Sequence, residues 1–303
     1  MSAEERITGK MERKEIMEAA LRLLPEDLRR AARDSGLLEH AEEIRLRIGR
    51  EAGILAEGGE RGLMPGRRVT AGDMSRVLEA ATQASAYSAV DKLRRGFITV
   101  QGGVRVGVCG TAVTENGRIT ALREPSSAAI RLPREVKGCA EGVVKALGGL
   151  DGSSVVLISP PGGGKTTLLR ELVRLCSENG CRVALADERG EVAGVWQGVP
   201  QLDVGGHTDV LTGGNKAETA MLLLRSMNPQ MLAMDEITAP EDITACETAA
   251  NCGVHILATV HGGSISDLRT RPLHRSLLER GVFQYAVMIK GTRGKRGYEV
   301  LEL

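Results

Sequence analysis

Residues 155–171 read VVLISPPGGGKTTLLRE, an apolar run that passes through a glycine-rich loop into a helix pattern. Successive glycines let backbone N–H groups turn inward around phosphate oxygens, and the positive end of the following helix favours an anion. We expect Lys165 to reach the β- and γ-phosphates of ATP and Thr166 to coordinate Mg²⁺ through its hydroxyl. The residues predicted to bind the nucleotide are Pro161, Gly162, Gly163, Gly164, Lys165, Thr166 and Thr167.

The loop departs from the phosphate-loop consensus at its first position, where Ser159 replaces glycine. That position serves the turn into the loop and makes no phosphate contact through its side chain, so we expect an altered turn that still binds phosphate. A glycine-rich connector with an incidental lysine is the alternative interpretation. The G-K-T-T core between a strand and a helix disfavours it.

Apolar strand segments alternate with helical segments after residue 153, which is typical of an α/β fold with a parallel sheet covered on both faces. Strands are predicted at 155–158, 182–186, 231–234 and 255–260, and helices at 165–177, 216–227 and 240–251. Residues 283–289 and 298–303 are predicted to close the sheet as strands joined by a turn at 291–297.

The preceding part of the chain predicts a smaller α+β domain. Helices are expected at 16–24, 26–33 and 74–84, strands at 44–48, around Ile119 and at 128–132, a hairpin at 97–110 that turns at Gly102 and Gly103, and a loop at 57–66. We place the boundary within residues 135–138. The predicted domains are therefore 1–137 and 138–303.

Two pairs of acidic residues follow predicted strands. Asp235 and Glu236 end the strand 231–234, which we expect to lie next to the strand of the phosphate loop. There Asp235 would hold Mg²⁺ and Glu236 would polarise the attacking water. Asp187 and Glu188 end another strand, and the carboxyl ends of parallel strands meet at one edge of the sheet. Either glutamate is a candidate general base; a solvated corner or a charged loop is the alternative for each pair.

His261 follows the strand 255–260 and is expected at the same edge. There it either senses the γ-phosphate or serves as a structural hydrogen-bonding residue. The candidates for charge stabilisation, within one chain or across a subunit boundary, are Arg225, Arg269 and Arg271.

Composition disfavours several classes of protein. The net charge is +1, and the aromatic residues are one Trp, three Tyr and two Phe. Neither feature favours nucleic acid as a partner, because proteins that bind nucleic acid carry basic surfaces and aromatic side chains that stack on bases. The six cysteines show no C-x-x-C spacing, which disfavours a zinc ribbon. Residues 1–34 are densely charged, unlike a signal peptide, and no apolar stretch reaches the roughly 18 residues that span a bilayer. We expect a cytoplasmic protein that meets a membrane only through a partner.

Several segments together resemble the family of the stage III sporulation protein AA. They are residues 97–110, 126–138, 159–171, 187–194 (DERGEVAG), 208–211, 224–237 (LRSMNPQMLAMDEI), 258–262 (ATVHG) and 267–272. The resemblance is dense in the C-terminal half and begins at about residue 43. It implies a RecA-like P-loop ATPase core related to the motors of type II and type IV secretion. Val104 departs from the histidine of the family's G-G-H-R-V segment.

The resemblance also implies roles for residues and partners. Asp187 and Glu188 fall in an acidic box, Asp235 and Glu236 form the Walker B pair, and His261 falls in a histidine box. The implied activity powers a channel between mother cell and forespore during endospore formation. The implied partners are a membrane protein encoded nearby and further copies of the chain in a hexameric ring. The protein would then lie in the mother-cell cytoplasm, peripheral to a membrane complex.

Three functions stay open at this point. The first is an ATP-driven motor, and the second is a nucleotide-dependent scaffold with little hydrolysis, which Glu188 and Glu236 disfavour. The third is a nucleic-acid translocase on the same core, which the balanced charge and scarce aromatic rings disfavour. A small-molecule kinase is less favoured still, because no acceptor-site signature is visible.

Overall fold

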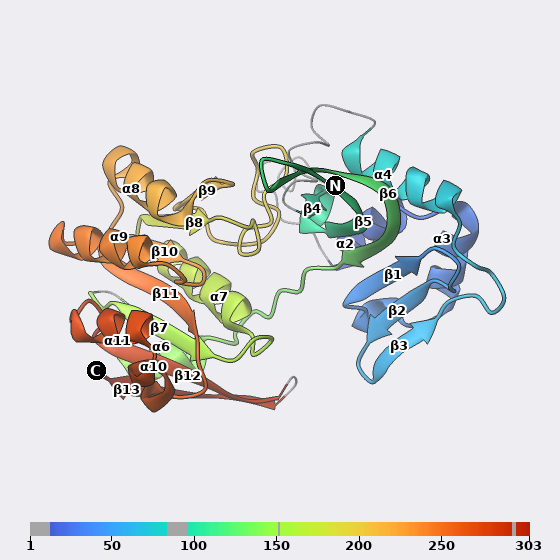
Figure 1. The fold of residues 1–303 in the computed structure, drawn as a ribbon. Helices are drawn as coiled ribbons and strands as arrows, with labels where there is room; N and C mark the ends of the chain where they lie inside the picture. Colours follow the sequence, from blue (N-terminus) through green and yellow to red (C-terminus); the bar gives the residue numbers. More distant parts are fainter. Residues whose placement is uncertain (1–12, 84–95, 151, 293–294) are drawn as a thin grey trace. The chain divides into compact units, whose positions relative to one another are not determined.

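The computed structural model describes residues 13–83, 96–150, 152–292 and 295–303 (Figure 1). Two compact units emerge: the first comprises Met1–Arg134 and Gly194–Leu202, and the second Glu135–Ala193 and Asp203–Leu303. The first unit thus includes a segment, 194–202, that the sequence analysis assigned to the second domain. The last residue of the predicted helix 74–84 and positions 293–294 of the predicted turn 291–297 lie outside the described residues.

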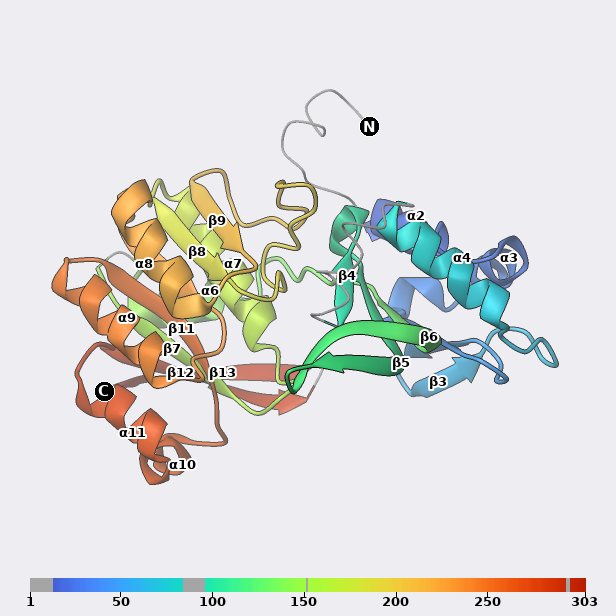
Figure 2. The same ribbon diagram turned by 45° about the horizontal axis from the view of Figure 1, so that its top comes forward.

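The first unit is built on a sheet of order β3-β2-β1-β6-β5-β4 whose paired strands run antiparallel. The strands are β1 (Glu43–Arg47), β2 (Gly53–Ala56), β3 (Gly59–Gly62), β4 (Phe97–Thr99), β5 (Arg105–Glu115) and β6 (Arg118–Arg131). Helices α2 (Arg13–Leu21), α3 (Glu26–Asp34) and α4 (Ala71–Thr82) gather on one side of the sheet (Figure 2) and share one apolar core with it. The α+β prediction matches this arrangement.

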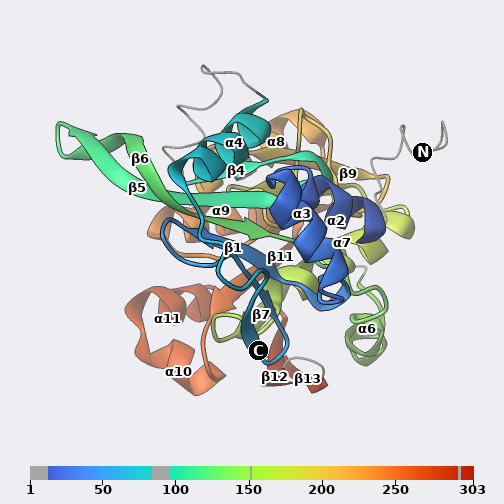
Figure 3. The same cartoon turned by 90° about the vertical axis from the view of Figure 1, so that its right-hand side faces the viewer.

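Two features of this sheet differ from the prediction. Residues 57–66 are not all loop, because β3 pairs with β2 in a hairpin that turns at Glu57 and Gly58, and Gly58 has a φ of 96°. All four residues of β3 are exposed, so no alternating pattern marks the strand. The two short strands predicted near residues 119 and 128–132 form one long strand, β6, whose hairpin with β5 extends beyond the helices of the unit (Figure 3).

The predicted turn at Gly102 and Gly103 is present as the short 3₁₀ helix η2 (Gln101–Gly103), with φ angles of 75° and 68°. The segment 194–202 packs against the turn at Gly102 and Gly103. Gln201 accepts a hydrogen bond from the Gly102 N–H at 3.0 Å through its side-chain oxygen, and Leu202 is buried. A Cβ on Gly194 would lie 3.1 Å from the Gly103 Cα, so glycine permits this close packing.

The second unit carries a sheet of order β13-β12-β7-β11-β10-β8-β9, parallel except that β13 pairs antiparallel with β12. The strands are β7 (Val155–Ser159), β8 (Val183–Asp187), β9 (Thr208–Thr212), β10 (Met231–Met234), β11 (His255–His261), β12 (Tyr285–Thr292) and β13 (Lys295–Glu302). The helices are α6 (Glu141–Leu147), α7 (Lys165–Glu178), α8 (Lys216–Met227), α9 (Pro240–Asn251), α10 (Ile265–Thr270) and α11 (Pro272–Glu279). Helices α6 and α7 lie on one face and α8 to α11 on the other (Figures 1 and 2), as right-handed crossovers require.

The expectation that the strand 231–234 lies next to the phosphate-loop strand is wrong. Strand β11 lies between them and pairs in parallel with β7 on one side and with β10 on the other. Its inner residues are wholly buried, which suits a central strand. Chain order does not determine spatial order in a doubly wound sheet, so the sequence could not reveal this insertion. Its consequence is that Thr259 and His261 lie between the phosphate loop and the acidic strand end.

The start of α4 supplies a testable electrostatic contribution to stability. Thr70 and Asp73 form a reciprocal cap, and Arg67 donates hydrogen bonds to both Asp73 oxygens at 2.7 and 2.8 Å. These bonds lower the pKa of Asp73 to about 2. A carboxyl whose folded pKa is depressed stabilises the fold above its unfolded pKa of about 3.9, and this stability is lost as the pH falls toward 2.

We therefore expect Asp73→Asn to lower the free energy of unfolding by about 2 kcal/mol at pH 7. The difference from the native protein should shrink to near zero at pH 2. Urea titrations between pH 2 and 7 measure it, with the exposed Asp34 replaced by Asn as the control. A difference that stays constant with pH would contradict the assignment.

Candidate functional site

The phosphate loop lies between the end of β7 and the start of α7, as its sequence predicts. Gly162 and Gly164 have φ angles of 74° and 97°, in the left-handed region that glycine adopts without strain. Gly163 has no room for a side chain, since a Cβ there would lie 1.7 Å from the Ser159 Oγ. The loop is thus a narrow turn of bare backbone at a helix N-terminus.

Ser159 is fully buried, and its hydroxyl donates to the Pro160 carbonyl at 3.0 Å. The serine that replaces the consensus glycine therefore occupies the space beneath Gly163. The two positions depend on each other, because the loop accommodates a side chain at 159 only while 163 has none.

Lys165 extends back along the loop. Its Nζ donates to the carbonyls of Ser159 and Pro160 at 3.0 and 3.2 Å and lies 2.8 Å from the His261 Nδ1. An ammonium only donates, so Nδ1 accepts and the ring proton belongs on Nε2, which lies 2.9 Å from a Glu236 oxygen. Burial lowers the pKa of Lys165, while the Asp235 and Glu236 carboxylates act in the opposite direction. The result is a continuous polar chain from Lys165 through His261 to Glu236.

Asp235 is the centre of a second set of contacts. One oxygen accepts from the Thr166 hydroxyl at 3.1 Å and the other from the Thr259 hydroxyl at 2.9 Å. Burial raises the pKa of Asp235. A cation beside this carboxylate would offset the cost of burying its charge.

The residues of the acidic box divide between two tasks. Asp187 is buried and accepts from the backbone N–H groups of Glu191, Val192 and Ala193 at 2.9 to 3.2 Å. Burial raises the pKa of Asp187 to about 6. Glu188 is more exposed and lies 3.6 Å from the Lys216 ammonium. Asp187 therefore shapes the loop after β8, while Glu188 faces a cavity.

That cavity has a volume of about 100 Å³ and lies where β8 and β10 end. Its lining residues are Asp187, Glu188, Arg189, Lys216, Asp235, Glu236 and Thr238. The structure thus brings together both predicted acidic pairs, as the convergence of parallel strand ends implies.

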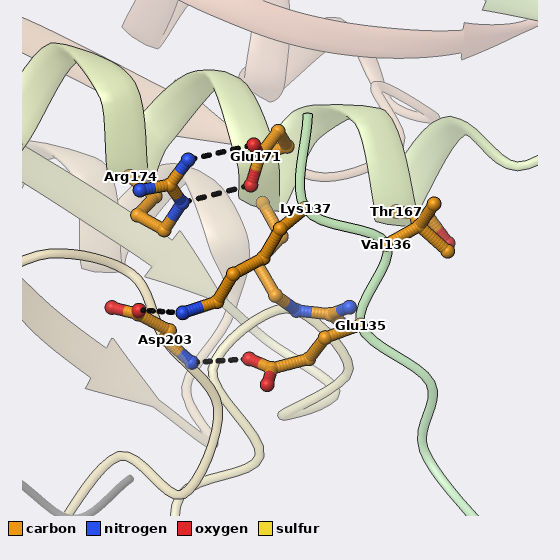
Figure 4. Close-up of a pocket in the computed structure, with 8 residues that line it drawn as sticks. Glu135, Val136, Lys137, Thr167, Glu171, Arg174 and Asp203 are labelled. Atoms are coloured by element: carbon orange, nitrogen blue, oxygen red, sulfur yellow. Dashed lines mark hydrogen bonds and ion pairs between the residues drawn. The ribbon is translucent and has the colours of Figure 1, made fainter. Parts of the chain in front are cut away.

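Thr167 faces away from this cavity, into a second, smaller pocket on the flank of α7 (Figure 4). There Lys137 contacts the Asp203 carboxylate at 3.1 Å, and Glu135 accepts from the Asp203 N–H at 2.6 Å. Figure 4 also shows Glu171 joined to Arg174 from one turn further along the helix. Pro161 lies exposed in the loop.

Other predicted residues stay apart from the site. Arg225 and Arg269 are exposed, and neither lines the cavity. Arg271 pairs with Asp267 at 2.9 Å and donates to the His261 carbonyl at 3.2 Å, so it supports the histidine from outside.

Sequence reasoning missed three cations near the site. Arg296 of β13 lies over the phosphate loop, 3.4 Å from the Gly162 carbonyl. Arg170 is buried in α7 and donates to the carbonyls of Glu191 and Val192. Lys216 is buried at the start of α8. None of the three belongs to a motif, so the sequence alone carried no signal for them.

These residues fit Mg-ATP. The loop offers backbone N–H groups and a lysine to an anion. The Thr166 hydroxyl and the Asp235 carboxylate, 3.1 Å apart, are hard oxygen ligands of the kind Mg²⁺ prefers. Nucleotide and metal would thus be held by Gly162 to Thr166 on one side and by Asp235 on the other.

Comparisons with known proteins identify the family and the fold of the chain. The sequence profile of the family described as "Sporulation stage III, protein AA" matches residues 11–300. The Stage III sporulation protein AA of Bacillus subtilis is 36% identical over 258 residues, which span 84% of this chain and 83% of that protein.

Solved structures show the same fold at low sequence identity. The Legionella pneumophila ATPase DotB superposes with a TM-score of 0.60 at 16% identity, over 91% of this chain and 80% of that one. The pilus retraction motor PilT, solved with bound ADP, gives 0.57 at 17% identity, over 90% and 82%. The predicted RecA-like α/β fold is thereby confirmed.

The close contact between positions 159 and 163 can be tested by a double mutant. We expect Gly163→Ala to destabilise the chain by about 1–3 kcal/mol, because a Cβ would overlap the Ser159 hydroxyl. Adding Ser159→Gly should recover most of that loss. Urea unfolding measures both, and Gly142→Ala in α6 is the control, since a Cβ there meets nothing within 4 Å. A double mutant as unstable as Gly163→Ala would refute the coupling.

Proposed function

The chain belongs to the sporulation stage III protein AA family, and on this premise we propose that it binds Mg-ATP and hydrolyses it to drive a machine at a membrane. The observation that carries the proposal is the polar chain Lys165–His261–Glu236 beside the Thr166–Asp235 pair. One connected set of contacts thus contains a lysine to neutralise phosphate, an oxygen ligand for the metal and a carboxylate to act as base.

The bound nucleotide supplies the phosphoanhydride bond, and its Mg²⁺ supplies positive charge for the oxygens. Lys165 would bind phosphate, and Thr166 and Asp235 would hold the metal. Glu236 would accept the proton that water loses as its oxygen bonds to the terminal phosphorus, the phosphoanhydride bond breaks and ADP leaves. His261 holds the Glu236 carboxylate through its Nε2 proton and faces Lys165 with its other nitrogen. Through the His261 imidazole, a movement of Lys165 on phosphate binding would be transmitted to Glu236.

Glu236 is our candidate for the general base, and Glu188 is not. Glu236 is joined to His261 and, through it, to the phosphate loop. Glu188 is more exposed and contacts Lys216 on the other wall of the cavity. The different contacts of the two glutamates favour Glu236 as the base, a question that the sequence left open.

The cellular role in the proposal follows family membership. The chain would power a channel between mother cell and forespore, assemble as a hexameric ring, and act with a membrane protein of that channel from the mother-cell cytoplasm. In the described part of the chain, no helix is long and apolar enough to cross a bilayer. Contact with the membrane would then run through the partner.

A nucleotide-dependent scaffold with little hydrolysis is the second candidate. It needs the phosphate loop and does not need a positioned base. The contacts of Glu236 favour the motor over the scaffold, since its carboxylate is held by His261, which in turn contacts Lys165 of the phosphate loop.

Lys165→Ala should abolish Mg-dependent ATPase activity and the rise in melting temperature that Mg-ATP produces, because the loop loses its only side-chain cation. Phosphate release and thermal unfolding measure the two effects. Lys145→Ala, at an exposed position of α6, is the matched control. Normal turnover in Lys165→Ala would show that the nucleotide acts elsewhere.

The two glutamates can be separated by isosteric changes. Glu236→Gln should lower kcat about 100-fold or more, since an amide accepts no proton, whereas Glu188→Gln should keep kcat within about tenfold of the native value. Steady-state ATPase assays decide. The scaffold gains if neither change alters turnover or sporulation while Lys165→Ala blocks sporulation.

Assembly is the third test of the proposal. Native mass spectrometry with a non-hydrolysable ATP analogue should show a hexamer that forms or strengthens with nucleotide. A chain that stays monomeric at every nucleotide and protein concentration would contradict the ring.

A further inference from the structure

We infer that Lys216 is a positioning residue of this site, which holds the Glu236 peptide in the conformation that aims its carboxylate at His261. The inference rests on the proposed ATPase function and adds a residue that neither the sequence motifs nor the family boxes include. Its basis is the set of contacts around the loop that follows β10.

Lys216 is the first residue of α8 and is only 5% exposed. Its Nζ donates to the Glu236 carbonyl and lies 3.6 Å from Glu188 and 3.7 Å from Asp242. A buried ammonium is costly unless acceptors surround it. These acceptors come from the ends of β8 and β10 and from α9, so Lys216 joins three elements at the cavity wall.

Glu236 has a left-handed backbone, with φ of 59°. A non-glycine residue adopts that region only when its surroundings hold it there, and such residues cluster at functional sites. Two side chains hold it: the Glu236 N–H donates to the Thr259 hydroxyl at 2.8 Å, and the Glu236 carbonyl accepts from Lys216. Both backbone groups of the strained residue are therefore fixed by side chains.

The following backbone N–H groups of the loop are also hydrogen-bonded, one to a backbone carbonyl and two to a side chain. The Ile237 N–H donates to the Thr259 carbonyl at 2.8 Å, and the N–H groups of Thr238 and Ala239 donate to Asp242 at 2.9 and 3.1 Å. Because Lys216 also lies beside Asp242, its charge supports the carboxylate that caps this loop. Removal of the ammonium would free the Glu236 carbonyl and take away the cation that lies beside the Asp242 carboxylate.

The side-chain direction of Glu236 depends on this backbone. A residue that relaxed from the left-handed to an ordinary region would turn its Cα–Cβ bond and carry the carboxylate away from His261. Misplacement of a reacting group by about 1 Å can cost about 100-fold in rate. Substrate binding would be spared, because Lys216 contacts no residue of the phosphate loop among its described partners.

The test compares Lys216→Met and Lys216→Arg in the full chain, with Lys145→Met as the control. For Lys216→Met we expect kcat to fall about 100-fold, while KM for ATP and the Kd of a fluorescent non-hydrolysable ATP analogue change less than about threefold. Lys216→Arg should recover at least about tenfold of the lost kcat, because a guanidinium donates to the same carbonyl. An unchanged kcat in Lys216→Met, or a loss of analogue binding equal to the loss of kcat, would overturn the inference.

Hydrogen exchange of the amides at 236–239 gives a readout that needs no activity. These amides should exchange at least about tenfold faster in Lys216→Met than in Lys145→Met, while the amides of β10 stay protected. Unchanged exchange at 236–239 would overturn the inference. A native chain that binds the analogue but does not hydrolyse ATP would instead contradict the proposed function, and hydrogen exchange would still decide the role of Lys216.

Discussion

The site depends on one half-buried carboxylate, Asp235. A carboxylate shielded from water needs hydrogen-bond donors, and here the hydroxyls of Thr166 and Thr259 supply them from α7 and β11. One side chain thereby ties the phosphate-loop helix, the central strand and the acidic strand end together. The same Thr259 hydroxyl also accepts from the Glu236 N–H, so the residue that donates to Asp235 also fixes the backbone of Glu236, the proposed base. In the proposed function, phosphate binding and water activation would thus depend on one hydrogen-bonded unit.

The position of β11 explains why this unit can form. Because the strand separates β7 from β10, its end places His261 between Lys165, at the start of α7, and Glu236, in the loop after β10. A histidine with one acceptor and one donor nitrogen suits that place, since it can face an ammonium and a carboxylate at once. The inner residues of β11 are buried in the sheet, and Thr259 and His261 near its end make the polar contacts of the site.

Local patterns predicted most of the second unit, and long-range contacts account for what they missed. Helices α8 and α9 and strand β10 have the bounds that periodicity and capping indicate, because each is an amphipathic or wholly buried segment with clear ends. The exposed strand β3 and the half-buried strand β9 carry no such pattern. For the site, the phosphate loop and both acidic pairs were visible as motifs. Lys216 and Arg296 were not, because a lone cation acquires a role only from what the fold places around it.

The segment 194–202 has a consequence for how the chain divides. It leaves the second unit after Ala193, packs by the Gly102–Gly103 turn, and returns at Asp203. A polypeptide cut before Glu135 would therefore carry these residues without the surface that buries Leu202. No single cut in the chain therefore separates the two units, because residues 194–202 belong to the first unit while the chain on either side of them belongs to the second.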